Sequence, residues 1–194
     1  IAESLINLID LFVGRIKGGL GAVAVVACAV FGSITGSSSA TLTCIGSIMF
    51  PRLKETGYPL GYTAALLASA SVLGILIPPS TLMILFSWVG GQSVLACFLA
   101  TLIPGIILTV MMALYNIWVL RNNDNLIVSE KLNAEQFKKA FAQRTYHAFP
   151  ALLMPIFILG GIYGGFVTPT EAAAVSAVYA IPIGFWVYKG LTMK

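Results

Sequence analysis

Two clusters of small, polar or helix-breaking residues interrupt stretches that otherwise carry mainly apolar side chains. The clusters are Gly36, Ser37, Ser38 and Ser39, and Gly74, Pro78, Pro79 and Ser80. Residues 18–50 and 57–120, which surround them, contain no acid, histidine, lysine or arginine. Hard cations bind to oxygen ligands in proteins, such as hydroxyl and carbonyl oxygens. These clusters could therefore form a cation site.

The same clusters should end helices and so make backbone groups available. Glycine and serine are weak helix formers, and proline lacks an N–H and clashes with the preceding turn. We expect helices to end near Thr35 and Leu76. New helices should begin near Ser39 and Ser80. Helix C-terminal ends offer carbonyls to a cation, and helix N-terminal ends favour an anion.

Sodium is the coupling ion that these groups favour, since a proton relay in a membrane normally uses Asp, Glu or His. The candidate sodium ligands are Ser37, Ser38, Gly74 and Pro78. In the alternative interpretation, the serines only allow close helix packing and the proline pair only kinks a helix. The occurrence of both interruptions in one chain favours a binding site.

The composition places the chain in a lipid bilayer. Of 194 residues, 58% are hydrophobic and 9% are charged, and the mean hydropathy is +0.94. Soluble domains carry roughly 25% charged residues. The net charge of +4 comes from basic residues in short loops, which indicates membrane topology and gives no indication of nucleic-acid binding.

The pattern predicts an all-α, polytopic helical membrane protein. The expected parts are an interfacial or arm helix (1–17), a re-entrant helical hairpin (18–50), a short basic loop (51–59), a Pro-broken transmembrane helix (60–89), a spanning helix (93–120), a cytoplasmic basic loop (121–148) that contains a surface helix (134–146), and two further transmembrane helices (149–194). The hairpin is expected because 18–50 is too short for two spans of about 20 residues each plus a turn.

Charge placement supports the hairpin. If residues 18–50 enter and leave the membrane on one side, all 11 basic residues share that side. They are Arg15, Lys17, Arg52, Lys54, Arg121, Lys131, Lys138, Lys139, Arg144, Lys189 and Lys194. The positive-inside rule assigns this side to the cytoplasm. A single span over 18–50 would instead leave Arg15 and Lys17 outside.

The remaining reactive residues favour structural roles. Cys28, Cys44 and Cys97 lie singly in apolar segments, as small core residues do. His147 borders an apolar run and is interpreted as interfacial. The run from Thr168 to Glu171 matches a helix capping box. We expect no enzyme, because no base lies near the hairpin serines in sequence to activate them; labelling of a hairpin serine by an electrophilic probe would indicate an intramembrane hydrolase instead.

Six stretches resemble a known family. They are Gly18 to Leu20, Phe31 to Ser37, Gly46 to Pro51, Gly57-Tyr58, Gly74 to Ser80 and Phe166 to Val175. In this order they resemble the large membrane subunit, of DctM type, of tripartite ATP-independent periplasmic (TRAP) transporters. The resemblance covers the whole chain but only about the first half of the family's protein. Departures are Ala40 to Thr43, where an acid often follows the tip, and Ile75, where a proline is common.

The resemblance implies one repeat of an inverted-repeat, elevator-type secondary transporter in a bacterial or archaeal inner membrane. Such a transporter imports carboxylates, such as C4-dicarboxylates or sialic acid, with sodium. Its partners are a small membrane subunit and a periplasmic substrate-binding protein. The resemblance also implies that residues 18–120 form half of a transport domain. The hairpin tip and the broken helix would form half of the ion and substrate site. No cofactor is expected beyond the coupling sodium ion.

Two further expectations concern the length of the protein and an alternative function. The chain opens on Ile1 without a signal-peptide pattern, and we expect it to be part of a longer polypeptide. The alternative function is a non-transporting membrane scaffold in which the hairpin only packs. Sodium-stimulated carboxylate uptake by the complete complex would separate the two.

Overall fold

The computed structural model describes residues 2–14, 16–123, 126–127 and 134–188, and every regular element in these ranges is helical. The elements are α1 (Ala2–Val13), α2 (Gly19–Thr35), α3 (Ser38–Glu55), α4 (Leu60–Ser71), α5 (Leu73–Leu76), α6 (Thr81–Val89), α7 (Val94–Leu120), α8 (Ala134–Tyr163), α9 (Pro169–Pro182) and a π-helical turn (Ile183–Val187). The predicted all-α class is confirmed. Arg15, Lys131, Lys189 and Lys194 lie outside the described residues.

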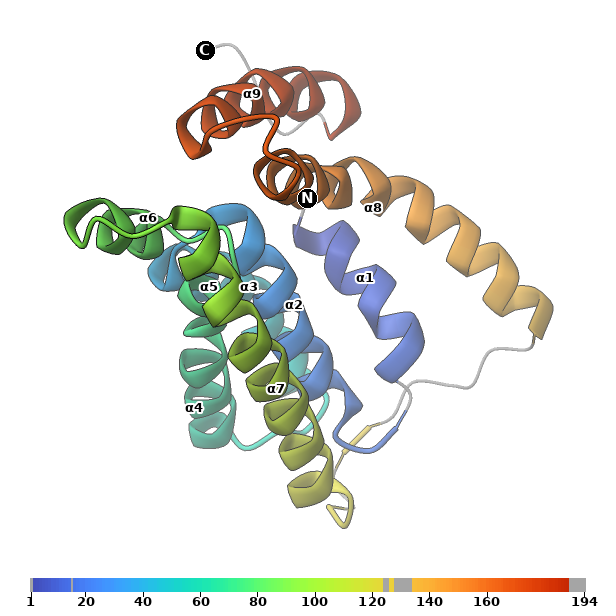
Figure 1. The fold of residues 1–194 in the computed structure, drawn as a ribbon. Coiled ribbons are helices and arrows are strands. Elements are labelled where there is room, and N and C mark those ends of the chain that lie inside the picture. Colours follow the sequence, from blue (N-terminus) through green and yellow to red (C-terminus); the bar gives the residue numbers. More distant parts are fainter. Residues whose placement is uncertain (1, 15, 124–125, 128–133, 189–194) are drawn as a thin grey trace.

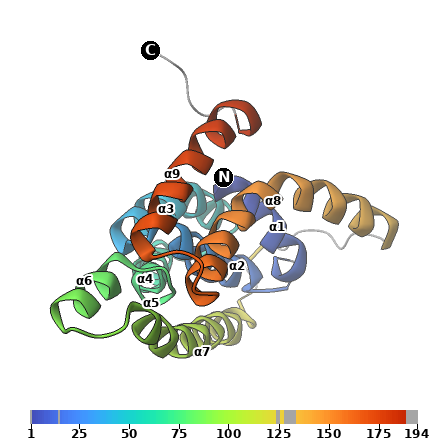
Figure 2. The ribbon, with the colours of Figure 1, turned by 45° about the horizontal axis from the view of Figure 1, so that its top comes forward.

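Helix α2 is the centre of the bundle (Figure 1). It packs against α1, α3, α4, α5 and α7, while α8 contacts α1 and α9 contacts α8. In Figure 2 the red α9 lies beside the C-terminal part of the orange α8, and Figure 1 shows it at the top of the molecule, away from α4 and α7. The arrangement places the α2–α3 turn close to the start of α6, the C-terminal end of α8 and the start of α9.

The core forms because α2 is apolar on every side. Its small residues, such as Val23, Ala27 and Cys28, are fully or almost fully buried, which is typical of a helix enclosed by other helices. Ile45 and Met49 of α3 pack against this cluster. The burial of Cys28 confirms its predicted core role.

Helix α3 differs from the prediction, which placed a loop from Pro51 onwards. The helix continues through Pro51 and ends at Glu55. Ile45, Met49 and Leu53 form one buried stripe at helical spacing, and the burial of Leu53 favours another turn of helix. Since proline removes only one backbone donor, this packing outweighs the lost bond.

Helix α8 also differs from the prediction, because the expected surface helix and the following span are joined. The segments Phe137–Tyr146 and Ala148–Tyr163 meet at a bend of 55° within α8. Pro150 lies four residues after Tyr146, where its ring clashes with the preceding turn and kinks a helix. His147 lies at this bend.

By length and composition, α7 can cross a membrane alone, with 27 residues and a mean hydropathy of 2.5. The helices from Leu60 to Leu76 and from Thr81 to Val89 are together long and apolar enough to cross a membrane, with a bend of 45° between them. The bent segments of α8 make a third candidate span. A helical membrane protein with a Pro-broken helix is therefore what the described residues contain.

Candidate functional site

Both predicted interruptions are present at the expected places. Helix α2 ends at Thr35, and α3 begins at Ser38 with Ser37 as its N-cap. Helix α5 ends at Leu76, and α6 begins after Ser80. We name residues 35–38 the tip and residues 77–80 the break.

The tip and the break are in direct contact. Gly36 has φ +61°, and its N–H donates to the carbonyl of Gly32. Its own carbonyl accepts a hydrogen bond from Thr81 Oγ1 at 3.1 Å. A Cβ atom built on Gly36 would lie 2.9 Å from the carbonyl oxygen of Pro79. The left-handed backbone and the close approach both require glycine here.

Gly74 makes a second close approach, to the start of α3. A Cβ atom on Gly74 would lie 2.5 Å from Thr41 Oγ1 and 2.9 Å from the carbonyl oxygen of Ser37. A Cβ atom on Gly32 would lie 2.4 Å from the Cα of Gly74. Two glycines thus allow α2 and α5 to cross with their backbones almost touching.

The break also leaves backbone carbonyls without their helical donors. In a continuous helix, the carbonyls of Gly74 and Ile75 would accept from the N–H groups four residues later. Those residues are Pro78 and Pro79, which have no N–H. Carbonyls without helical donors are tolerated at membrane depth where they are buried in protein or line a cavity.

Ser80 is the most unusual residue of this site. It is fully buried, and it is the N-cap residue of α6 without capping it. Its Oγ has no hydrogen-bond partner among the described residues. It lines a cavity of about 220 Å³ together with Gly36 and Thr81. Residues of α8 and α9, among them Ile162 and Ser176, close the other side. A buried hydroxyl without a partner is costly, which favours a polar occupant.

The hairpin serines are placed differently from one another. Ser37 Oγ caps α3 by accepting from the N–H of Ala40, and it lies 3.1 Å from Ser39 Oγ. Ser38 is half-buried and Ser39 is exposed. The described bonds of the Ser37 and Ser39 hydroxyls therefore lie within the first turn of α3. It is the backbone of the tip that meets the break.

Sequence reasoning missed Thr35 and Thr41. Thr41 Oγ1 donates to the carbonyl of Ser37 at 2.8 Å and lies 3.1 Å from Thr35 Oγ1. Thr41 is fully buried. The available signal was its position four residues after Ser37, which places a hydroxyl over the helix start.

It also missed a polar network at the other end of α2. The side chain of Asn116, fully buried in α7, donates to the carbonyl of Gly18. Its Oδ1 accepts from the hydroxyl of Tyr62 at 3.0 Å. Beside it, the N–H of Gly21 donates to the hydroxyl of Tyr58 at 3.0 Å. The signal was a lone amide in a 27-residue apolar helix.

The capping box that begins α9 is confirmed. Thr168 Oγ1 accepts from the N–H of Glu171, and the N–H of Thr168 donates to Glu171 Oε2 at 2.7 Å. The backbone and hydroxyl hydrogen bonds of Thr168 hold the pKa of the exposed Glu171 carboxyl below its usual value.

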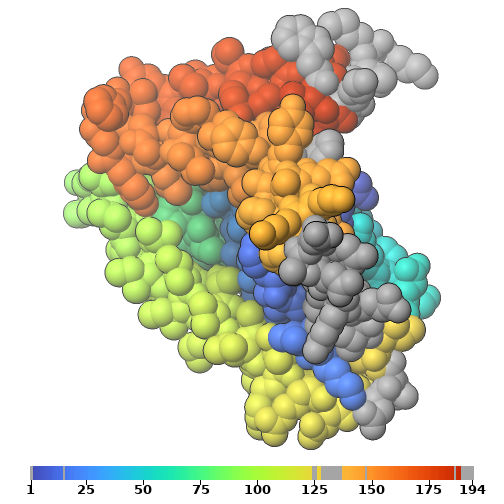
Figure 3. Space-filling model, turned by 90° about the vertical axis from the view of Figure 1, so that its right-hand side faces the viewer, coloured from blue at the N-terminus to red at the C-terminus, as the bar shows by residue number. Residues whose placement is uncertain are grey.

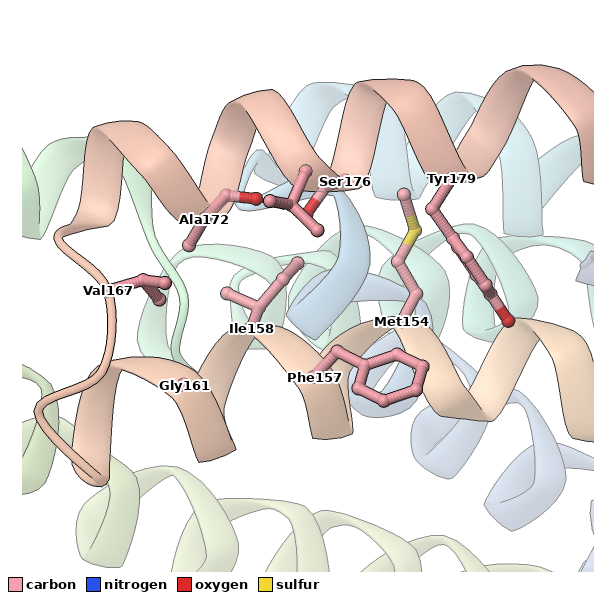
Figure 4. A pocket seen from close by; sticks show the side chains of 9 residues that line it. Met154, Phe157, Ile158, Gly161, Val167, Ala172, Ser176 and Tyr179 are labelled. Carbon is pink, nitrogen blue, oxygen red and sulfur yellow. The ribbon is translucent and has the colours of Figure 1, made fainter.

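A separate cavity of about 260 Å³ lies between α8 and α9 (Figure 4). Most of its walls are apolar, as at Met154 and Phe157. The hydroxyl of Ser176 donates to the carbonyl of Ala172, and that of Tyr179 donates to the carbonyl of Pro150. With both hydroxyls engaged, this cavity resembles a packing gap more than an ion site.

Comparison with known proteins identifies the family of this chain. The sequence profile of the family described as "Tripartite ATP-independent periplasmic transporter, DctM component" matches residues 1–194. The chain belongs to this DctM family. The DctM chain is 36% identical to the C4-dicarboxylate TRAP transporter large permease protein DctM of Rhodobacter capsulatus, over 100% of this chain and 46% of that protein.

Two other relatives carry different substrate names. The ectoine TRAP transporter large permease protein TeaC of Halomonas elongata is 36% identical over 100% of the DctM chain and 44% of its own length. The isethionate TRAP transporter permease protein DctMQ of Oleidesulfovibrio alaskensis is 33% identical over 99% of this chain and 30% of its own. The chain spans less than half the length of these relatives. They are transport proteins, so the expectation that the chain is not an enzyme is confirmed.

Proposed function

We propose that the DctM chain is the first half of the large membrane subunit of a sodium-coupled secondary transporter in the inner membrane. It imports a carboxylate, such as a C4-dicarboxylate or a sialic-acid-like molecule, that a periplasmic binding protein delivers. A small membrane subunit completes the complex. Relatives named for C4-dicarboxylate and ectoine support a small carboxylate as the substrate class.

The observation that carries this proposal is the contact between the tip and the break. Helix C-termini at Thr35 and Leu76 and the donor-free carbonyl of Gly74 supply negative partial charge. Helices α3 and α6 begin beside them and supply positive partial charge at their N-termini. A cation and an anionic substrate can therefore bind near each other, and each favours the other.

The proposed sodium ligands are Ser37, Ser38, Gly74 and Pro78, with Gly36, Ser39, Pro79 and Ser80 completing the ion and substrate site. A cage without a carboxylate binds sodium weakly by itself. The negative charge of the substrate is then needed to hold the sodium ion, so the transport of sodium is coupled to the transport of the substrate.

Sodium dependence of uptake tests this site. Ser38→Ala and Ser80→Ala in the complete complex should each raise the sodium concentration for half-maximal uptake about fivefold, the effect of losing one oxygen contact worth about 1 kcal/mol. The measurement is uptake of radiolabelled substrate into proteoliposomes over a sodium series. Ser47→Ala is the control, because Ser47 is an exposed residue of α3 whose hydroxyl donates to the carbonyl of Cys44.

Two results would count against the proposal. Uptake that is independent of sodium would show that sodium is not the coupling ion. An unchanged sodium dependence in both variants would show that Ser38 and Ser80 do not bind it. A complex that assembles but takes up no substrate under any ion gradient would instead indicate the scaffold function.

If α2 and α3 enter and leave the membrane on the same side, as we propose, the positions before and after them should be labelled from one side only. Cysteines replacing Lys17, Arg52 and Arg121 should react with a membrane-impermeant maleimide only from the cytoplasm, and one replacing Gln92 only from outside. The complete subunit would first have its native cysteines replaced by alanine. Labelling of positions 17 and 52 from opposite faces would make residues 18–50 a single span.

A further inference from the structure

A polar cavity lies between α1 and α8, away from the tip and the break. It has a volume of about 360 Å³ and is lined by Ser4, Asn7, Ala140, Gln143 and Arg144. Figure 3 shows this face, where the orange α8 lies against the blue N-terminal segments. Four of its five lining side chains are polar, which is unusual in a chain of this composition and indicates a polar occupant.

Two guanidinium groups converge on Asn7 beside this cavity. Arg144 Nη1 donates to the backbone carbonyl of Asn7 at 2.6 Å, and Arg52 Nη1 donates to its Oδ1 at 3.2 Å. Asn7 is neutral and cannot balance two positive charges. An anion placed beside Asn7 would therefore relieve the repulsion between the two arginines.

One carboxylate lies close to this pair. Asp10 Oδ2 is 3.6 Å from Arg144 Nη1, and both side chains are about one-third exposed, at 30% and 36%. The contact is long and partly solvated, so it balances Arg144 only weakly. Within the described residues, the Arg52 guanidinium bonds to the side-chain amide of Asn7. The cluster thus keeps net positive charge.

The surroundings of the cluster are those of a membrane interface. Phe12 packs edge-on against Phe137 and Phe141, with ring centroids 6.2 and 5.8 Å apart. Phe12 is 62% exposed and Phe141 is 40% exposed. Lys138 and Lys139 are exposed on the same helix. Exposed aromatic rings beside basic residues are typical of a helix that lies in the headgroup region.

We propose that the cavity between α1 and α8 binds the phosphate headgroup of an anionic phospholipid. Arg144, which lines the cavity, contacts the phosphate, and Arg52, which is bonded to the Asn7 side chain, adds positive charge beside it. A guanidinium matches phosphate oxygens in charge and geometry. Gln143 and Ser4 line the headgroup space, and Phe12 lies beside the acyl chains. The aromatic neighbours favour a lipid over a soluble phosphate. This site is separate from the proposed sodium site.

Lipid retention tests the site. The complete complex is reconstituted in mixed vesicles of phosphatidylcholine and phosphatidylglycerol and extracted in mild detergent, and the bound lipids are quantified by mass spectrometry. Arg144→Gln and Arg52→Gln should each lower the ratio of bound phosphatidylglycerol to phosphatidylcholine about fivefold, as expected for one basic group at an anionic surface. The control is Arg121→Gln, which removes a charge at the end of α7, where Arg121 lies 5.9 Å from the Trp118 ring.

Two further variants separate binding from packing. Asp10→Asn removes the ion pair but keeps both arginines, so the lipid ratio should stay or rise. Ala140→Trp keeps every charge but fills the cavity, so the ratio should fall even if the arginine variants do not assemble. An equal fall in Arg121→Gln, a fall in Asp10→Asn, or displacement of phosphatidylglycerol by inorganic phosphate would each overturn the proposal.

Discussion

Gly74→Ala is expected to lower substrate uptake by the complete transporter roughly tenfold or more. The new methyl carbon would lie 2.5 Å from Thr41 Oγ1 and 2.9 Å from the carbonyl oxygen of Ser37. Both neighbours are held in place, because Thr41 is fully buried and bonded to that carbonyl. Overpacking of this kind costs about 1–3 kcal/mol, and the helices must separate where the sodium ion is proposed to bind.

The measurement is initial uptake at saturating sodium, with the amount of assembled complex determined in parallel. Gly61→Ala makes the same chemical change on α4, where a Cβ atom would have nothing within 4 Å, and it should transport normally. If Gly74→Ala assembled and transported as well as Gly61→Ala, the close contact would have no part in transport.

The helix interruptions could be predicted from sequence because they follow from covalent chemistry. Pro78 and Pro79 cannot donate hydrogen bonds, and glycine next to serines is a poor helix interior. Helices accordingly end at Thr35 and Leu76, as predicted. That the hairpin enters and leaves the membrane on the same side stays a prediction, because the position of a helix end does not fix its depth in the bilayer.

The contact between the two interruptions could not be read from their spacing. It depends on the crossing of α2 and α5 at Gly32 and Gly74, which is a tertiary feature. The interpretation of Pro51 as a loop residue was wrong for a similar reason. Its local signal favours a helix end, but the burial of Leu53 beyond it favours another turn. Tertiary packing decided both cases.

Lone polar residues in apolar helices were harder still to interpret. Thr41 and Asn116 are single residues without a motif, so their importance follows only from their burial and their partners. Asn116 in particular joins the end of α7 to the loop before α2. Its position next to Tyr62 appears only once α4 and α7 are placed together.

Asn116→Leu should destabilise the protein by about 2–5 kcal/mol. Leucine has the same branching and the same number of side-chain heavy atoms as asparagine, but it leaves the carbonyl of Gly18 and the hydroxyl of Tyr62 without their partner. Each buried polar group that loses its partner costs about 1–3 kcal/mol. Gly18 has φ +79° and lies against α7, so the chain before α2 has little freedom to find a substitute.

The purified complex should then unfold roughly 5–15 °C earlier in a thermal scan at fixed rate, given about 2–4 °C per kcal/mol for a chain of this size. Tyr62→Phe removes one hydroxyl and should cost less, because the amide of Asn116 keeps its bond to Gly18. The control is Asn122→Leu at an exposed position just after α7. An unfolding temperature for Asn116→Leu equal to that of this control would mean that the network contributes nothing to the attachment of α7 to α2.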